Sequence, residues 1–223
     1  MRKNSDIRTF EDRRFQTSMA RASIAVVAGG VAVGVLWGVG VGTLSASSGV
    51  AMEPFESPSP AVWALSLAAA VLASLALHEL VHAFFFRRFA PPGARVTFGA
   101  NLRAGMVYAS AEGVVYTRDQ YRVIALSPSI VVTALLIAVG IGLKWPLWTI
   151  VTATAHLSGC TGDWGYVARI DRDPSIKWCE DTSWGVRFYG EDLEDAPAGF
   201  SVVDGGKGAG KGSDDPSEGG DAE

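Results

Sequence analysis

The sequence predicts a mainly α membrane protein: a bundle of four transmembrane helices with a small cytoplasmic β-hairpin and a disordered C-terminal tail. Three observations support this fold class. Nearly half of the 223 residues are hydrophobic, long central segments carry almost no charge while both ends are highly charged, and the number of Lys and Arg alternates from loop to loop. Long uncharged apolar segments between charged loops are typical of membrane proteins.

Four apolar segments define the predicted spans. A helix needs about 20 apolar residues to cross a bilayer, and four segments meet this length: residues 22–44, 61–86, 123–143 and 147–167. Pro60, before the second segment, suits the start of a helix. Pro128 in the third segment predicts a kink, because proline lacks an N–H. We expect the freed carbonyl to bond the flanking serine hydroxyls or a neighbour.

The first apolar segment carries a glycine every four residues: Gly30, Gly34, Gly38 and Gly42. One face of this helix therefore lacks side chains, and another backbone can approach it closely. We expect this face either to pack against another helix of the bundle or to form a homo-oligomer contact.

Positive charges set the predicted orientation. There are six Lys and Arg before the first segment, none and six in the next two loops, one in the third loop, and six after the last segment. Since loops rich in Lys and Arg stay in the cytoplasm, we expect an integral protein of the cell membrane with both termini cytoplasmic. The predicted parts are an N-terminal arm (1–21), a membrane domain (22–170), a cytoplasmic segment (171–200) and a disordered tail (201–223).

The cytoplasmic parts contain short β patterns. Residues 95–117 hold β-branched and aromatic residues separated by Gly and Asn, which predicts a hairpin. Residues 182–190 predict one further strand. Residues 201–223 are rich in Gly, Asp, Ser and Lys with few apolar side chains, as in disordered segments.

Composition also argues against other classes of protein. The formal net charge is −4 and the sequence has no basic stripe, so we do not expect the chain to bind nucleic acid. The two cysteines, Cys160 and Cys179, are too few for a disulfide framework and lie near or on the predicted cytoplasmic side. We expect both to be reduced.

The second apolar segment contains the pentapeptide HELVH, which places His78, Glu79 and His82 inside an apolar helix. Histidines four residues apart project from one helix face and can hold one metal ion, and the glutamate can accept a proton from a water molecule on that metal. Ionisable groups inside a membrane helix are costly and are usually partnered and functional. We predict a metal site, against the simpler alternative that both histidines lie at the interface near the helix end.

Zinc needs a third protein ligand, with a fourth position left for water in a catalytic site. At 1.5 Å per residue, His78 and His82 lie roughly 27 and 33 Å along the second span. In the fourth span the corresponding values are roughly 15 Å for His156, 21 Å for Cys160 and 26 Å for Asp163. We therefore predict Asp163 as the third ligand.

Other candidates stay open at this point. Cys160 is a rival ligand if Gly159 and Gly162 unwind the helix, and Glu112 on the second cytoplasmic loop is a weaker one. His156 shares a helix face with Asp163, so it could support a metal ligand or donate a hydrogen bond to the reacting oxyanion. Alternatively, it is a packing residue bonded to a backbone carbonyl.

Three stretches resemble a family of zincin peptidases of undefined function, similar in motif plan to site-2 intramembrane metalloproteases. They are HELVHAFFFRRF, YASAEGVVYTRDQYRVIALSPSIVV and HLSGCTGDWGYVARI, between residues 75 and 170. The resemblance implies zinc ligands His78 and His82, catalytic base Glu79, and third ligand Asp163 from the final Gly-Asp pair. The chain lacks the Leu-Asp-Gly motif of site-2 proteases and an evident PDZ-like insert.

Together these features lead us to expect a membrane-embedded zinc metallopeptidase that hydrolyses peptide bonds of membrane or membrane-proximal substrates. Glu79 and His156 are its expected catalytic residues, and an unpaired edge of the hairpin could receive an extended substrate. The main rival is a non-catalytic metal-binding scaffold or client-binding membrane protein. A metal transporter ranks last, because the first and third spans offer almost no polar path.

Overall fold

The computed structural model describes residues 3–9, 11–49, 59–101, 106–111, 113–190 and 201–202. Within this part of the chain the fold is mostly helical, with two small sheets. The predicted disordered tail lies outside the described residues except for its first two positions, Ser201 and Val202.

Three helices are long and apolar enough to cross a membrane. They are α1 (Arg13–Ser48), α2 (Pro60–Phe89) and α3 (Arg118–Leu143), with 36, 30 and 26 residues. Many large apolar side chains on these helices are exposed, among them Leu36, Leu65 and Ile141. Apolar surface of this kind is expected where a helix faces lipid rather than water. The first three predicted spans therefore each correspond to one helix.

Side-chain caps explain where these helices begin. The Asp12 carboxylate accepts hydrogen bonds from the first turn of α1, and the Ser59 hydroxyl does the same before Pro60 in α2. At α3, Thr117 and Gln120 form a capping box. Each cap satisfies backbone N–H groups that have no partner within the helix.

The predicted fourth span is divided. Helix α4 (Pro146–Gly159) ends at Cys160, and a second helix, α5 (Thr161–Arg172), follows at once. The 14 residues of α4 extend only about 21 Å, less than a bilayer core. The prediction of one helix over 147–167 is therefore wrong, and a count of four spans is not confirmed.

Helix α4 packs beside α1, where glycines allow close approach. A side chain at Gly30 would overlap Thr154 of α4, and one at Gly34 would touch Leu147. Gly38 and Gly42 have open space around them. The glycine face predicted from the sequence thus packs against α4 along half of its length.

A five-stranded sheet is built from four separate parts of the chain, in the order β1-β6-β5-β4-β7. Its strands are β1 (Lys3–Arg8), β4 (Val114–Thr117), β5 (Trp178–Thr182), β6 (Gly185–Tyr189) and β7 (Ser201–Val202). The β4–β7 pair is parallel and the other neighbours are antiparallel. At Gly185, with φ +143°, a side chain would collide with the carbonyl oxygen of Ile7, so β1 can approach this closely only at glycine.

The second sheet is the hairpin of β2 (Thr97–Asn101) and β3 (Met106–Ser110). It lies within the predicted hairpin of residues 95–117, but the end of that range forms β4 of the larger sheet instead. The single strand predicted over 182–190 is corrected to the second half of the β5–β6 hairpin. Strand β1 was not predicted, because its residues read as a charged arm.

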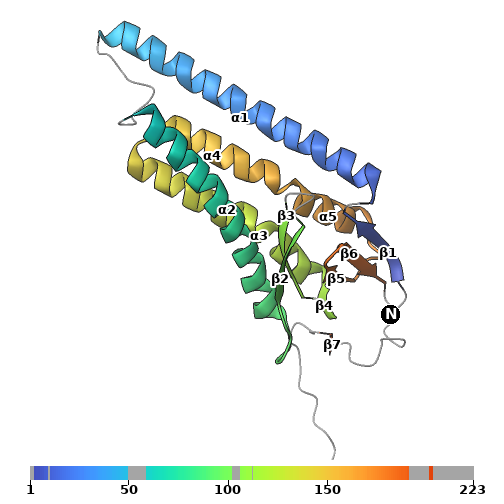
Figure 1. The fold of residues 1–223 in the computed structure, drawn as a ribbon. Coiled ribbons are helices and arrows are strands. Elements are labelled where there is room, and N and C mark those ends of the chain that lie inside the picture. The colour runs from blue at the N-terminus through green and yellow to red at the C-terminus, as the bar shows by residue number, and fades with distance from the viewer. Residues whose placement is uncertain are drawn as a thin grey trace, which may run out of the picture.

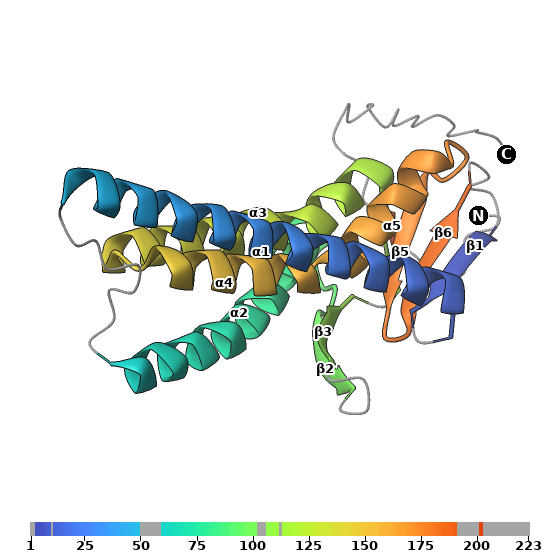
Figure 2. The ribbon, with the colours of Figure 1, turned by 90° about the horizontal axis from the view of Figure 1, so that it is seen from above.

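Figures 1 and 2 show the long helices extending toward one end of the molecule and the sheets gathered at the other. The largest buried core lies where helices and sheets meet, and joins Phe86 of α2, Ile124 of α3, Ile170 of α5 and Phe188 of β6. The functional side chains singled out in the sequence lie beside this junction.

Candidate metal centre and active site

His78, Glu79 and His82 lie in the second half of α2, where the helix approaches the sheets. The two imidazoles are one turn apart, and their Nε2 atoms are 3.1 Å from each other. Both rings are largely buried, with side-chain exposures of 13% and 10%. One face of α2 therefore presents two nitrogen donors to the same point.

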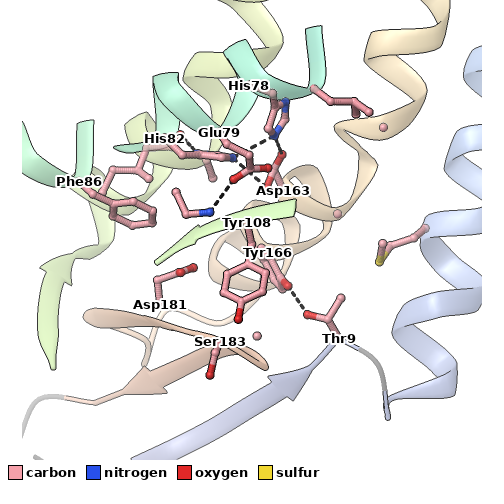
Figure 3. Close-up of a pocket in the computed structure, with 18 of the residues that line it drawn as sticks. Thr9, His78, Glu79, His82, Phe86, Tyr108, Asp163, Tyr166, Asp181 and Ser183 are labelled. Atoms are coloured by element: carbon pink, nitrogen blue, oxygen red, sulfur yellow. Dashed lines mark hydrogen bonds and ion pairs between the residues drawn. The ribbon is translucent and has the colours of Figure 1, made fainter. Parts of the chain in front are cut away.

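Asp163 reaches that point from α5. Its Oδ2 lies 3.2 Å from Nε2 of His78, and its Oδ1 lies 3.5 Å from Nε2 of His82 (Figure 3). Asp163 is in the first turn of α5, where the helix dipole favours a negative charge. The next residue, Trp164, donates from Nε1 to the Ser129 hydroxyl at 2.8 Å, which fixes this turn against α3.

These three residues, hereafter the carboxylate cluster (His78, His82 and Asp163), fit the requirements of zinc. Tetrahedral ligands at about 2.0 to 2.1 Å from zinc are separated from one another by about 3.3 Å. The two Nε2 atoms are 3.1 Å apart, and each has one oxygen of the Asp163 carboxylate near it, Oδ2 at 3.2 Å from His78 and Oδ1 at 3.5 Å from His82. Two imidazoles and one carboxylate are also a ligand set of catalytic zinc sites, which keep a fourth position open.

Pro128 explains how His82 is oriented. Because proline has no N–H, the carbonyl oxygen of Ile124, four residues earlier in α3, has no helical partner at that position. His82 Nδ1 lies 3.1 Å from this oxygen, and the Ser127 hydroxyl donates to it at 3.0 Å. A carbonyl can only accept, so Nδ1 carries a proton and Nε2 is left to face the cluster. Both partners expected for the freed carbonyl, a flanking serine and a neighbouring helix, are present.

His78 is held by a second histidine. Its Nδ1 lies 3.4 Å from Nε2 of His156 on α4, and His156 Nδ1 lies 3.0 Å from the hydroxyl of Thr133 on α3. His156 is buried and contacts the ring nitrogen of His78 that faces away from Asp163. Its two ring nitrogens thus lie next to His78 and the Thr133 hydroxyl, and its supporting role stays a prediction.

His78 also belongs to a second possible metal site, the thiol cluster (His78, His156 and Cys160). Cys160 Sγ lies 3.7 Å from His78 Nδ1 and 3.7 Å from His156 Nε2. These distances approach the roughly 3.6 Å expected between a sulfur and a nitrogen ligand of zinc. However, Cys160 is 0% exposed and its thiol donates to the His156 carbonyl oxygen, so this site has no open side.

Glu79 is held by the hairpin. The backbone N–H of Ala109, in β3, donates to Glu79 Oε2 at 2.7 Å (Figure 3). This N–H points away from β2, so the edge of β3 opposite β2 faces the cluster. The carboxylate of Glu79 is thus fixed beside the two histidines from outside its own helix.

Residues 71–176 match the family model described as "Putative zincin peptidase". The family resemblance predicted from the motifs is confirmed. All five predicted site residues lie within the zincin peptidase segment, and the family's description favours metallopeptidase chemistry. No curated protein and no solved structure matches the chain.

The candidate site opens into a cavity of about 340 Å³. Glu79 and the carboxylate cluster line one side of it, and the β5–β6 turn with Asp181 lines another (Figure 3). Tyr121 donates its hydroxyl to Asp181 at 3.0 Å. Burial raises the pKa of Asp181 to about 7, although the bond from Tyr121 and the charge of His82 act in the opposite direction.

The structure thus brings together all five residues that were predicted for the site, and whether they bind zinc stays a prediction. Glu112, the weaker ligand candidate, lies outside the described residues. The sequence analysis missed Asp181 and the Ala109 N–H. Neither has a motif, because each reaches the site only through strand pairing that the sequence does not reveal.

Proposed function

We propose that this chain is a membrane-embedded zinc metallopeptidase that cleaves membrane or membrane-proximal polypeptides. His78, His82 and Asp163 would hold the zinc ion, and Glu79 would be the general base. The observation that carries this proposal is the convergence of two imidazole nitrogens and one carboxylate, whose nearest atoms lie 3.1 to 3.5 Å apart, on a cavity that also contains Glu79. The match to the zincin peptidase family supports it independently.

When bound, zinc would polarise a water molecule and lower its pKa toward about 7. Glu79 would accept the proton of that water as it attacks the scissile carbonyl. The Ala109 N–H holds Oε2, so Oε1 is the oxygen that takes the proton. Glu79 would then return the proton to the leaving amine, which must be protonated to depart.

We propose that His156 acts as a positioning residue. If His78 binds zinc through Nε2, its Nδ1–H donates to His156 Nε2, and His156 Nδ1–H in turn donates to Thr133. Such hydrogen bonds fix the tautomer and the ring orientation of a metal ligand. Donation to the reacting oxyanion is less favoured, because His156 lies behind His78 as seen from Asp163.

The surroundings of the site support a membrane-linked substrate. Three helices have the length and composition of membrane spans, and the site lies near the sheet end of one of them, α2. A helical substrate must unwind before cleavage, because its carbonyls are engaged in hydrogen bonds. We propose that the unwound segment adds to the β3 edge, where Tyr108 and Ala109 line the cavity.

Glu79→Gln tests the proposal directly. Purified protein would be incubated with a proteome-derived peptide library, and cleavage would be read by mass spectrometry alongside zinc content. The variant should keep stoichiometric zinc and lose at least about a hundredfold in cleavage rate, as expected for removal of a general base. The matched control is Glu11→Gln, a surface residue paired with Arg8, which should change neither quantity.

A scaffold gives a different pattern. If the wild-type protein binds zinc but cleaves no peptide of the library, or if Glu79→Gln cleaves as fast as wild type, the peptidase proposal is contradicted and a non-catalytic metal-binding role is favoured.

A further inference from the structure

Among the residues that the structure describes, Asp181 lines the active-site cavity and forms no salt bridge. It belongs to β5, faces the cavity opposite the carboxylate cluster, and bonds the Tyr121 hydroxyl at 3.0 Å (Figure 3). In the part of the chain that the structure describes, no Lys, Arg or His lies within ion-pair distance of it. A buried carboxylate is costly without a compensating positive charge.

Two arginines of the same sheet are engaged elsewhere. Arg187 bonds Glu180 at 2.8 Å and Arg8 pairs with Glu11 at 3.2 Å. Both guanidinium groups also lie over the ring of Trp184, that of Arg8 at 5.2 Å and that of Arg187 at 5.3 Å from its centroid. They are therefore held beside the β5–β6 turn and away from Asp181.

The balance of charges in the cavity also leaves the Asp181 carboxylate without a compensating positive charge. This step rests on the proposed function: the two positive charges of a zinc ion would be offset by the carboxylates of Asp163 and Glu79. The histidine ligands would be neutral. Asp181 would then be the one carboxylate among the described cavity residues that no positive charge balances.

We infer that Asp181 is a specificity residue that binds a cationic group of the substrate close to the scissile bond. The turn residues Thr182, Ser183 and Trp184 form the rest of the wall beside it, where the Thr182 hydroxyl donates to the Gly185 carbonyl oxygen and the Trp184 ring is held by Arg8 and Arg187. A carboxylate at the wall of a cavity suits the charged head of a lysine or arginine side chain, or a terminal ammonium group, because it can accept a charge-assisted hydrogen bond from either. The substrate class is thus a polypeptide with a positive charge at the cleavage site.

Three small hydroxamates test this inference by binding rather than by turnover. Hydroxamates chelate zinc and place their side chain in the adjoining subsite. Acetyl-lysine hydroxamate carries a side-chain ammonium, acetyl-norleucine hydroxamate has the same stem without charge, and norleucine hydroxamate with a free amine carries a terminal ammonium. Affinities for the zinc-loaded full-length protein would be measured by calorimetry in detergent.

At least one cationic probe should bind the wild-type protein about tenfold or more tightly than acetyl-norleucine hydroxamate, as expected for a buried charge-assisted contact. Which of the two gains affinity identifies the source of the charge. In Asp181→Asn the advantage should disappear, while acetyl-norleucine hydroxamate binds as before. Tyr121→Phe is the matched control, because it removes a partner of Asp181 but keeps the carboxylate.

Equal affinities of the three probes for wild type would overturn the inference, even if Asp181→Asn failed to fold. A preference that persists in Asp181→Asn would overturn it as well. If no hydroxamate binds, the proposed zinc site itself fails, and the inference falls with it.

Discussion

The carboxylate cluster and the thiol cluster share His78 but differ in what surrounds them. The carboxylate cluster lines a cavity and has Glu79 beside it. The thiol cluster is closed, since Cys160 is fully buried and does not line the cavity. Both have donor separations close to those of zinc ligands.

Donor distances alone therefore do not distinguish a catalytic site from a structural one. The distinction lies in an open coordination position and a nearby base. On this comparison we propose that zinc binds on the side of Asp163, with His156 and Cys160 behind the proposed ligand His78.

The largest expected effect comes from removing Asp163 from the carboxylate cluster, and the matched change in the thiol cluster is Cys160→Ser. Asp163→Asn should weaken zinc binding by more than about a hundredfold, because the cost of a lost ligand exceeds that of a lost supporting contact. Cys160→Ser should leave zinc stoichiometry at one. Competition titration with a chelator measures both, and the opposite ranking would move the zinc ion to the thiol cluster.

His156 should have a smaller effect. His156→Leu leaves His78 Nδ1–H without its acceptor, so zinc affinity should fall by about ten- to a hundredfold. His156→Gln keeps an acceptor and should recover part of that loss. Complete loss of zinc in both variants would instead show His156 to be a ligand.

Pro128 tests how the other imidazole is held. Pro128→Ala restores an N–H that competes for the Ile124 carbonyl oxygen, so His82 should be less well oriented and zinc affinity should fall by up to about tenfold. Ser127→Ala removes the other donor to that oxygen and leaves His82 in place. It should not weaken zinc binding; a loss equal to that of Pro128→Ala would point to general disruption of α3.

The smallest effect concerns Asp181, which adjoins only the carboxylate cluster's cavity. Its pKa is about 7 in the folded protein against 3.8 ordinarily. Between these values the folded state binds a proton that the unfolded state releases, so the free energy of unfolding falls as pH rises, by at most about 1.4 kcal/mol per pH unit.

Asp181→Asn should remove this contribution. Thermal unfolding of the metal-free proteins from pH 5 to pH 7 should therefore show the Tm of wild type falling relative to that of the variant. Parallel pH profiles would contradict the burial of the Asp181 carboxyl group.

The sequence was most informative where chemistry follows local spacing. The four-residue interval fixes His78 and His82 on one face of a helix, and axial rise alone placed Asp163 near their level. The sequence did not predict the end of α4 at Cys160. Glycines such as Gly159 and Gly162 favour the end of a helix but also occur inside helices, so they indicated only that the helix could unwind there. Asp181 and β1 depend on pairing between distant strands, for which the sequence carries no local signal.

X-ray absorption spectroscopy of the zinc-loaded protein tests the central claim most directly, because it identifies the atoms bound to zinc. The structure predicts a first shell of nitrogen and oxygen alone at about 2.0 to 2.1 Å, with scattering from two imidazole rings. A sulfur atom at about 2.3 Å would place the metal in the thiol cluster and contradict the account.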